Sequence, residues 1–193
     1  MAGHFEAVPG GGAAVALDEV EVSILRSLTV QLLELIGPGD EPGADADPLA
    51  ALFAEGPTEP PSDPALRRLF PDAYGDDTEE LRAAAADFRR YTENDLRARK
   101  REDALAVVRA LDGMASEGQE ESAVLKLTPD ESRAWLGTLN DLRLTIATRL
   151  DITEDEESER LYRLPDSDPR KPMVMAYLWL GALQESLVET LMS

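Results

Sequence analysis

Apolar and polar positions follow two different periods along this chain, and the pattern separates extended from helical stretches. Short apolar runs at 5–8 and 13–17 flank the turn Pro9-Gly10-Gly11-Gly12, which predicts an N-terminal β-hairpin. The run 123–127 predicts a third short strand. Elsewhere apolar residues recur every three or four positions. The sequence therefore predicts a mainly α (α+β) fold, a bundle of about five to seven helices with a small N-terminal β element.

Helix start signals set the expected boundaries. Thr128, Pro129 and Glu131 have the spacing of a capping box with proline in the first turn, and Asp18 with Glu21 repeats that spacing. The helix after Thr128 presents a continuous apolar stripe, from which we expect Trp135 to anchor the core. The expected helices cover 18–36, 65–70, 77–111, 128–152, 153–159 and 173–192.

Connecting segments are rich in turn-forming residues. The stretch 38–62 is rich in Pro, Gly, Asp and Glu and predicts a mobile loop with a short helical island at 49–53. A polar linker is expected from Asp112-Gly113 to about residue 121. The length of 193 residues fits one domain over 1–193, with the loop inside it.

The chain is strongly acidic, with a formal net charge of −20. Such a field repels phosphate backbones at long range, so contact with DNA is disfavoured and a protein or basic-peptide partner suits the charge better. The alternative is that the acidic surface only maintains solubility. The chain has no cysteine, which excludes disulfides, thiolate catalysis and thiol redox sensing.

Neither a leader peptide nor a membrane span is expected. The N-terminus lacks a basic region followed by an apolar core, and no run approaches the ~20 apolar residues that a span requires. The expected location is cytoplasmic.

Basic residues gather only on the long helix predicted from residue 77. On a helical wheel they occupy about a third of the circumference, away from most of the apolar positions. This stripe either binds nucleic acid or an acidic partner, or it pairs with carboxylates of the same helix and its neighbours. Its members are Arg82, Arg89, Arg90, Arg97, Lys100 and Arg101.

Catalytic signatures are absent from the sequence. The chain has one histidine, His4, near the N-terminus, which argues against a Ser-His-Asp arrangement and a His-containing metal site. The acidic run 154–157 lacks the alternating ligands and the glycine of a calcium loop. We therefore expect no enzyme activity, no cofactor and no metal site. Catalysis by carboxylates alone stays open, because burial and geometry rather than spacing identify such pairs.

Several segments, taken in order over nearly the whole chain, resemble a known family, and they are 68–74, 88–91, 134–136, 139–143 and 177–185. Together they are similar to the AosR-like family of actinobacterial oxidative-stress transcriptional regulators, long described as a domain of unknown function. The resemblance implies a cytosolic, non-enzymatic regulator that acts through contact with a sigma factor or RNA polymerase. Because this chain has no thiol, any family mechanism based on cysteine oxidation cannot operate in it.

The resemblance thus implies a transcription-associated protein that functions in stress response by binding a protein. The alternative is an acidic helical adaptor or dimeric scaffold that binds only proteins and no DNA, with the apolar segment 173–192 as the seam of a homodimer. The predicted partner-binding residues are Arg89, Arg90, Tyr91, Arg97 and Arg101.

Overall fold

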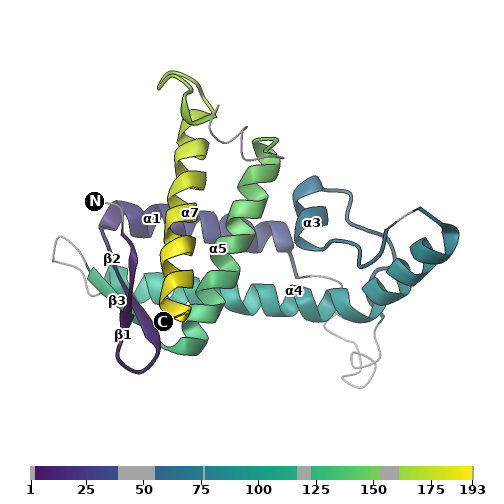
Figure 1. Cartoon of the computed structure of the whole chain (residues 1–193), viewed down its shortest axis with the longest axis horizontal. Coiled ribbons are helices and arrows are strands. Elements are labelled where there is room, and N and C mark those ends of the chain that lie inside the picture. Colours follow the sequence, from purple (N-terminus) through teal and green to yellow (C-terminus); the bar gives the residue numbers. More distant parts are fainter. Residues whose placement is uncertain (1–2, 39–54, 76, 117–122, 153–160, 193) are drawn as a thin grey trace.

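The computed structural model describes residues 3–38, 55–75, 77–116, 123–152 and 161–192. Two long helices, α1 (Glu19–Ile36) and α4 (Glu79–Ser116), run in opposite directions along the length of the molecule (Figure 1). A second antiparallel pair, α5 (Pro129–Arg149) and α7 (Lys171–Leu191), crosses them. The prediction of a mainly helical α+β fold is confirmed, with five helices in the described part of the chain.

A small antiparallel sheet lies at one end of the long helices. Its strands are β1 (Phe5–Val8), β2 (Gly12–Leu17) and β3 (Ala123–Leu127), in the order β1-β2-β3. The hairpin and the third strand are therefore confirmed. Gly10 and Gly11 both have positive φ, as the tight turn requires.

Both predicted capping boxes are present. The Asp18 carboxylate accepts from the Glu21 backbone N–H at 2.8 Å, and the Glu21 side chain accepts in return from the Asp18 N–H. Thr128 and Glu131 make the same reciprocal pair at the start of α5. These caps are local, since both partners lie within one helical turn, and this explains why the sequence alone located the two helix starts.

The long helix α4 ends later than predicted. It passes through Asp112 and Gly113 to Ser116, so the expected polar linker after Leu111 is wrong at its start. A glycine inside a helix costs about 1 kcal/mol relative to alanine. Leu111 and Met114 flank Gly113, and both are buried in the core. Burying a large apolar side chain stabilises the fold by about 1.5–3 kcal/mol, which outweighs the cost of the glycine, so the helix continues.

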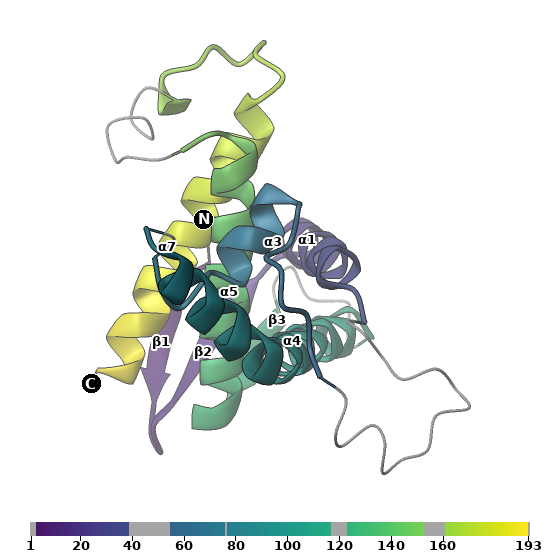
Figure 2. The same ribbon diagram turned by 90° about the vertical axis from the view of Figure 1, so that its right-hand side faces the viewer.

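α5 is the central element of the fold. It contacts α1, α3 (Pro64–Leu69), α4, α7 and the strands β2 and β3 (Figure 2). Trp135 on α5 is 1% exposed, as predicted, and its ring meets Phe5 edge to face at a centroid distance of 5.9 Å. The Phe5 N–H also donates to Ser186 Oγ of α7 at 3.0 Å. One helix thus joins the sheet to both helical pairs.

Some predicted features lie outside the described residues. They are the helical island at 49–53, most of the predicted loop 38–62 and the short helix at 153–159. The described part of that loop, 55–62, contains no helix or strand. Among the described helices, none combines the length and the apolar character needed to cross a membrane.

Candidate partner-binding surface

The C-terminal end of α1 is closed by arginines from α4. Arg101 Nη1 donates to the carbonyl oxygens of Gly37 at 2.9 Å and Leu33 at 3.3 Å, and Arg97 donates to the carbonyl oxygen of Ile36. α1 has no basic residue in its own last turn. Another helix therefore supplies the positive charge that stabilises the C-terminus of α1. The same helix supplies the donors for the free carbonyl groups of that end.

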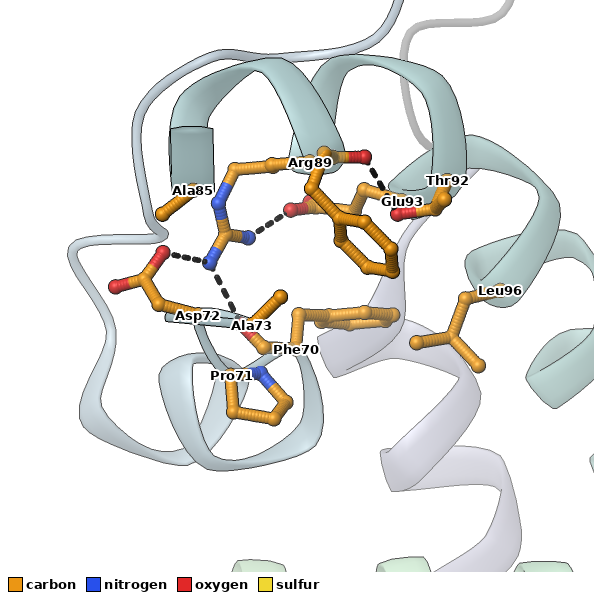
Figure 3. Close-up of a pocket in the computed structure, with 10 residues that line it drawn as sticks. Phe70, Pro71, Asp72, Ala73, Ala85, Arg89, Thr92, Glu93 and Leu96 are labelled. Atoms are coloured by element: carbon orange, nitrogen blue, oxygen red, sulfur yellow. Dashed lines mark hydrogen bonds and ion pairs between the residues drawn. The ribbon is translucent and has the colours of Figure 1, made fainter. Parts of the chain in front are cut away.

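Arg89 lies at the centre of a buried ionic cluster. Its guanidinium donates to Asp72 Oδ1 at 2.8 Å, to the Phe70 carbonyl oxygen at 2.9 Å and to Glu93 (Figure 3). Arg97 donates to the other oxygen of Glu93 at 2.7 Å. Burial acts against the charged form of Arg89, but the hydrogen bonds to Asp72 and Glu93 more than offset it and raise the Arg89 pKa. This cluster fixes the turn after α3 to α4.

Lys100, the next basic residue on this side of α4, also has an internal partner. Its Nζ lies 2.6 Å from Oδ1 of Asp141 on α5, whose carboxylate is buried. Burial raises the pKa of Asp141, and the hydrogen bond from Lys100 opposes that rise. The basic stripe thus attaches α4 to α1, to the turn at 70–72 and to α5, with carboxylates and carbonyl oxygens as acceptors.

The five predicted partner-binding residues divide into two groups. Arg89 is buried, while Arg97 and Arg101 are half-buried and hydrogen-bonded inside the protein. Tyr91 is 68% exposed, and the partly exposed Arg90 pairs with Glu55 and lies 5.5 Å from the centre of the Tyr91 ring. Geometry therefore leaves Arg90 and Tyr91 as the members that reach solvent. The role of all five in partner binding stays a prediction.

A pocket of about 200 Å³ opens between α4 and the turn that follows α3 (Figure 3). Its polar wall is the Arg89 cluster, and its apolar walls are aromatic and aliphatic. Sequence reasoning did not predict this pocket. Its signal is an apolar series on α4, at positions 81, 88 and 96, that lies mostly away from the basic stripe but borders it at Arg89. The lining residues are Phe70, Pro71, Asp72, Ala73, Ala85, Phe88, Arg89, Thr92, Glu93 and Leu96.

A second hollow of about 280 Å³ lies on the other side of Glu93. Its lining residues are Ile36, Pro57, Glu59, Pro61, Glu93, Asn94 and Arg97. Gly56, next to Pro57, donates its N–H to the Arg90 carbonyl oxygen at 2.8 Å, which holds this part of the chain against α4. Within the described ranges, no group of three or more histidine, aspartate and glutamate side chains could hold a metal ion.

The segments on which the family resemblance rests meet in two places. Residues 68–74 and 88–91 join through Arg89 and through an edge-to-face contact of Tyr74 with Phe88, at a centroid distance of 6.3 Å. Residues 139–143 and 177–185 join through Arg143 of α5, which donates to Gln184 Oε1 of α7 at 2.6 Å. The first of these places is also the wall of the 200 Å³ pocket.

Comparison with known proteins identifies relatives over most of the chain. The family described as "Domain of unknown function (DUF2017)" matches residues 2–191. A protein of Mycobacterium leprae (strain TN) is 32% identical over 184 residues, which are 90% of this chain and 79% of that protein. Proteins named oxidative stress regulator AosR, from Mycobacterium bovis (strain ATCC BAA-935 / AF2122/97) and Mycobacterium tuberculosis (strain ATCC 25618 / H37Rv), are 31% identical over 183 residues, 89% of this chain and 78% of each. No solved structure matches the chain significantly.

Proposed function

This chain belongs to the DUF2017 family, and we propose that it is a non-enzymatic, transcription-associated regulator that acts in stress response by contact with a sigma factor or RNA polymerase. The observation that carries the proposal is the similarity, over about nine-tenths of the chain, to proteins named oxidative stress regulators. Those names indicate a regulatory role rather than catalysis. We take the location to be cytoplasmic, as the sequence predicts.

The charge of the chain supports a protein partner over DNA. A net charge of −20 repels a phosphate backbone, and the basic side chains that could have formed a DNA-binding stripe are largely engaged inside the protein. The alternative function is an adaptor or scaffold that binds only proteins, and the negative charge of the chain suits it equally well. In that alternative the segment 173–192 is the dimer seam. Several apolar residues of that segment, including Leu180, Leu183 and Leu187, are buried within one chain.

The solvent-facing pair Arg90 and Tyr91 is the proposed contact point on α4. An exposed tyrosine beside an arginine has the composition that dominates binding energy at protein interfaces. Arg89, Arg97 and Arg101 support this face from behind by fixing α4 to α1 and to the turn at 70–72. Substituting those three would disturb the fold, so they cannot report on binding.

Capture of RNA polymerase and its sigma factors from the native host tests the proposal. The bait is the full chain, either unchanged or carrying Arg90→Glu with Tyr91→Ala. The matched control is Arg109→Glu, an exposed arginine elsewhere on α4. We expect the double variant to capture at least about tenfold less of the complex than the unchanged chain. The control should capture the same amount as the unchanged chain. All variants should keep the unchanged chain's circular dichroism and melting temperature.

Equal capture by the double variant and the unchanged chain would remove Arg90 and Tyr91 from the contact. Absence of any polymerase subunit from the unchanged chain's complexes would overturn the proposed function in favour of the adaptor. A parallel measurement of binding to DNA upstream of the chain's own gene addresses direct contact, because such binding weakens steeply with salt.

A further inference from the structure

The outer face of the N-terminal half of α4 is apolar and exposed. Leu81, Phe88 and Leu96 are 37%, 49% and 39% exposed, and they lie seven and eight residues apart, near the repeat of two helical turns. No helix or strand of the described chain covers this face. We call it the outer face of α4, and it consists of Leu81, Ala84, Phe88, Thr92 and Leu96 around the buried Ala85.

The 200 Å³ pocket opens within the outer face. Phe88 and Leu96 of α4 line it together with Phe70 and Ala73 from the turn after α3. An engineered apolar cavity of about 150 Å³ holds a benzene molecule, whereas sites for small-molecule ligands usually enclose about 300–1,000 Å³. The pocket therefore has room for one large apolar side chain and is small for a cofactor.

The walls of the pocket are fixed before anything binds. The Arg89 cluster holds the Phe70 carbonyl oxygen and Asp72 against α4, and Tyr74 packs edge to face on Phe88. Arg97 lies over the Phe70 ring, with its guanidinium carbon 4.4 Å from the ring centroid. Binding to such a site costs little ordering of the protein, which is the condition for a pocket that receives an anchor side chain.

Exposed carboxylates lie along one side of the outer face and at its N-terminal end. Asp77, Glu80, Asp87 and Asp95 are exposed, and among the described residues none of them has an ion-pair partner within 4.0 Å. Of the neighbouring arginines, Arg82 is paired with Glu79, and Arg99, three residues beyond Leu96, is exposed, so carboxylates outnumber free cations here. The rim is thus negative, as is the chain as a whole. A partner that covers the apolar centre must offer positive charge at its edges.

We propose that the outer face of α4 binds a basic amphipathic helix of a protein partner, which inserts one large apolar side chain into the pocket. The apolar series repeats along α4 with the period of a helix, so a second helix can pack along it and place lysine or arginine against the acidic rim. A second copy of this chain fits poorly, because a two-fold contact would set the same carboxylates against each other. This inference rests on the proposed function only in taking the partner to be a protein.

A synthetic peptide tests the inference without knowledge of the natural partner. The probe is a fluorescein-labelled amphipathic helix of about 18 residues with a leucine face and lysines elsewhere, long enough to be helical when bound. Its matched control carries glutamate in place of every lysine. Binding to the full chain is measured by fluorescence anisotropy at low and physiological salt. We expect the lysine peptide to bind and the glutamate peptide not to bind.

Two charge-neutral substitutions separate groove binding from general attraction between opposite charges. Phe88→Ala removes a wall of the pocket, and Ala73→Phe fills the pocket from its exposed side. Each substitution should raise the Kd of the lysine peptide at least about tenfold. Leu105 is an exposed leucine elsewhere on α4, and the control Leu105→Ala should change this Kd by less than about twofold. Equal affinity in all three variants, or equal binding of both peptides, overturns the inference.

Two further measurements distinguish the other outcomes. Sedimentation velocity measures the oligomeric state of the unchanged chain and of Phe88→Ala. A dimeric unchanged chain with a monomeric Phe88→Ala variant would show that a second copy occupies the face, and that result also overturns the inference. Polymerase capture is repeated with Phe88→Ala. Peptide binding that depends on Phe88 and Ala73 supports the groove even if no polymerase is captured, so the failure of the proposed function can be told apart from the failure of the groove.

Discussion

Arg101 of α4 donates to the carbonyl oxygen of Gly37 at 2.9 Å, and so one helix caps the end of another. Gly37 is the C-cap of α1 and has φ 65° and ψ 177°, a conformation that essentially only glycine adopts. Since α1 has no basic side chain in its last turn, Arg101 and Arg97 supply its charge complement. This contact fixes the C-terminal end of α1 against α4 in the antiparallel pair.

Arg101→Gln should therefore lower the free energy of unfolding by about 1 to 2 kcal/mol, because charged hydrogen bonds to two carbonyl oxygens are lost while the side chain keeps most of its length. Denaturant unfolding measures the change. Arg99→Gln, an exposed arginine two positions away, is the matched control and should stay within about 0.5 kcal/mol of the unchanged chain. Equal effects of both variants would show that the cap contributes no stability.

Trp135→Ala should be the most destabilising of the substitutions considered. The side chain is 1% exposed and packs against Phe5, so truncation leaves a cavity at the centre of the fold and should cost about 3–5 kcal/mol. Calorimetry or denaturant unfolding checks this value. Leu105→Ala removes an exposed apolar side chain and serves as the reference for truncation without a cavity. A melting temperature unchanged in Trp135→Ala would contradict the placement of this residue.

Asp103 should make stability depend on pH. Burial raises its pKa above the ordinary value of 3.8, assisted by Glu102 and opposed by Arg99 and Lys100. In the window between 3.8 and the higher folded pKa, the folded protein binds more protons than the unfolded chain. The stabilisation from this group is therefore complete below the ordinary value and is lost as pH rises through the folded pKa. Asp103→Asn should therefore gain stability relative to the unchanged chain as pH rises from 3.8 through the raised folded pKa of Asp103.

Unfolding midpoints of both chains across that pH range measure the Asp103 effect. Asp95→Asn, an exposed carboxylate on the same helix, is the control for the general loss of negative charge. Because Asp103 also raises the pKa of Asp141, its removal should favour the ion pair of Asp141 with Lys100 at neutral pH. A stability difference that is the same at every pH, or that has the opposite slope, would contradict the assigned shift.

Local signals predicted a large part of the fold. The two capping boxes, the glycine turn and the apolar stripes each depend on residues within a few positions of one another, and the corresponding elements are present at Asp18, Thr128 and 5–17. The helix end at Leu111 was predicted wrongly from Asp112-Gly113. That turn signal is local, whereas the burial of Met114 that overrides it depends on packing against distant elements.

The candidate surface was less accessible to sequence reasoning. A helical wheel showed that the arginines of α4 share one side, but the acceptors of Arg101 and Arg97 lie 64 and 61 residues away in the chain. Whether a cation faces solvent or a helix end is decided by which elements pack beside it. The pocket likewise combines a turn at 70–73 with a helix face at 85–96, which the sequence placed in separate elements.

The sequence by itself determined the elements of this protein, their caps, its acidity, its lack of thiols and its family resemblance, because each follows from neighbouring residue types or from composition. Only the tertiary structure decided what the basic stripe does and which face of α4 remains open. The reason is physical: desolvated ions need partners, so folding directs Arg89, Arg97 and Arg101 to internal acceptors. The face of the same helix that carries Leu81, Phe88 and Leu96 stays exposed, and it is the proposed partner-binding face.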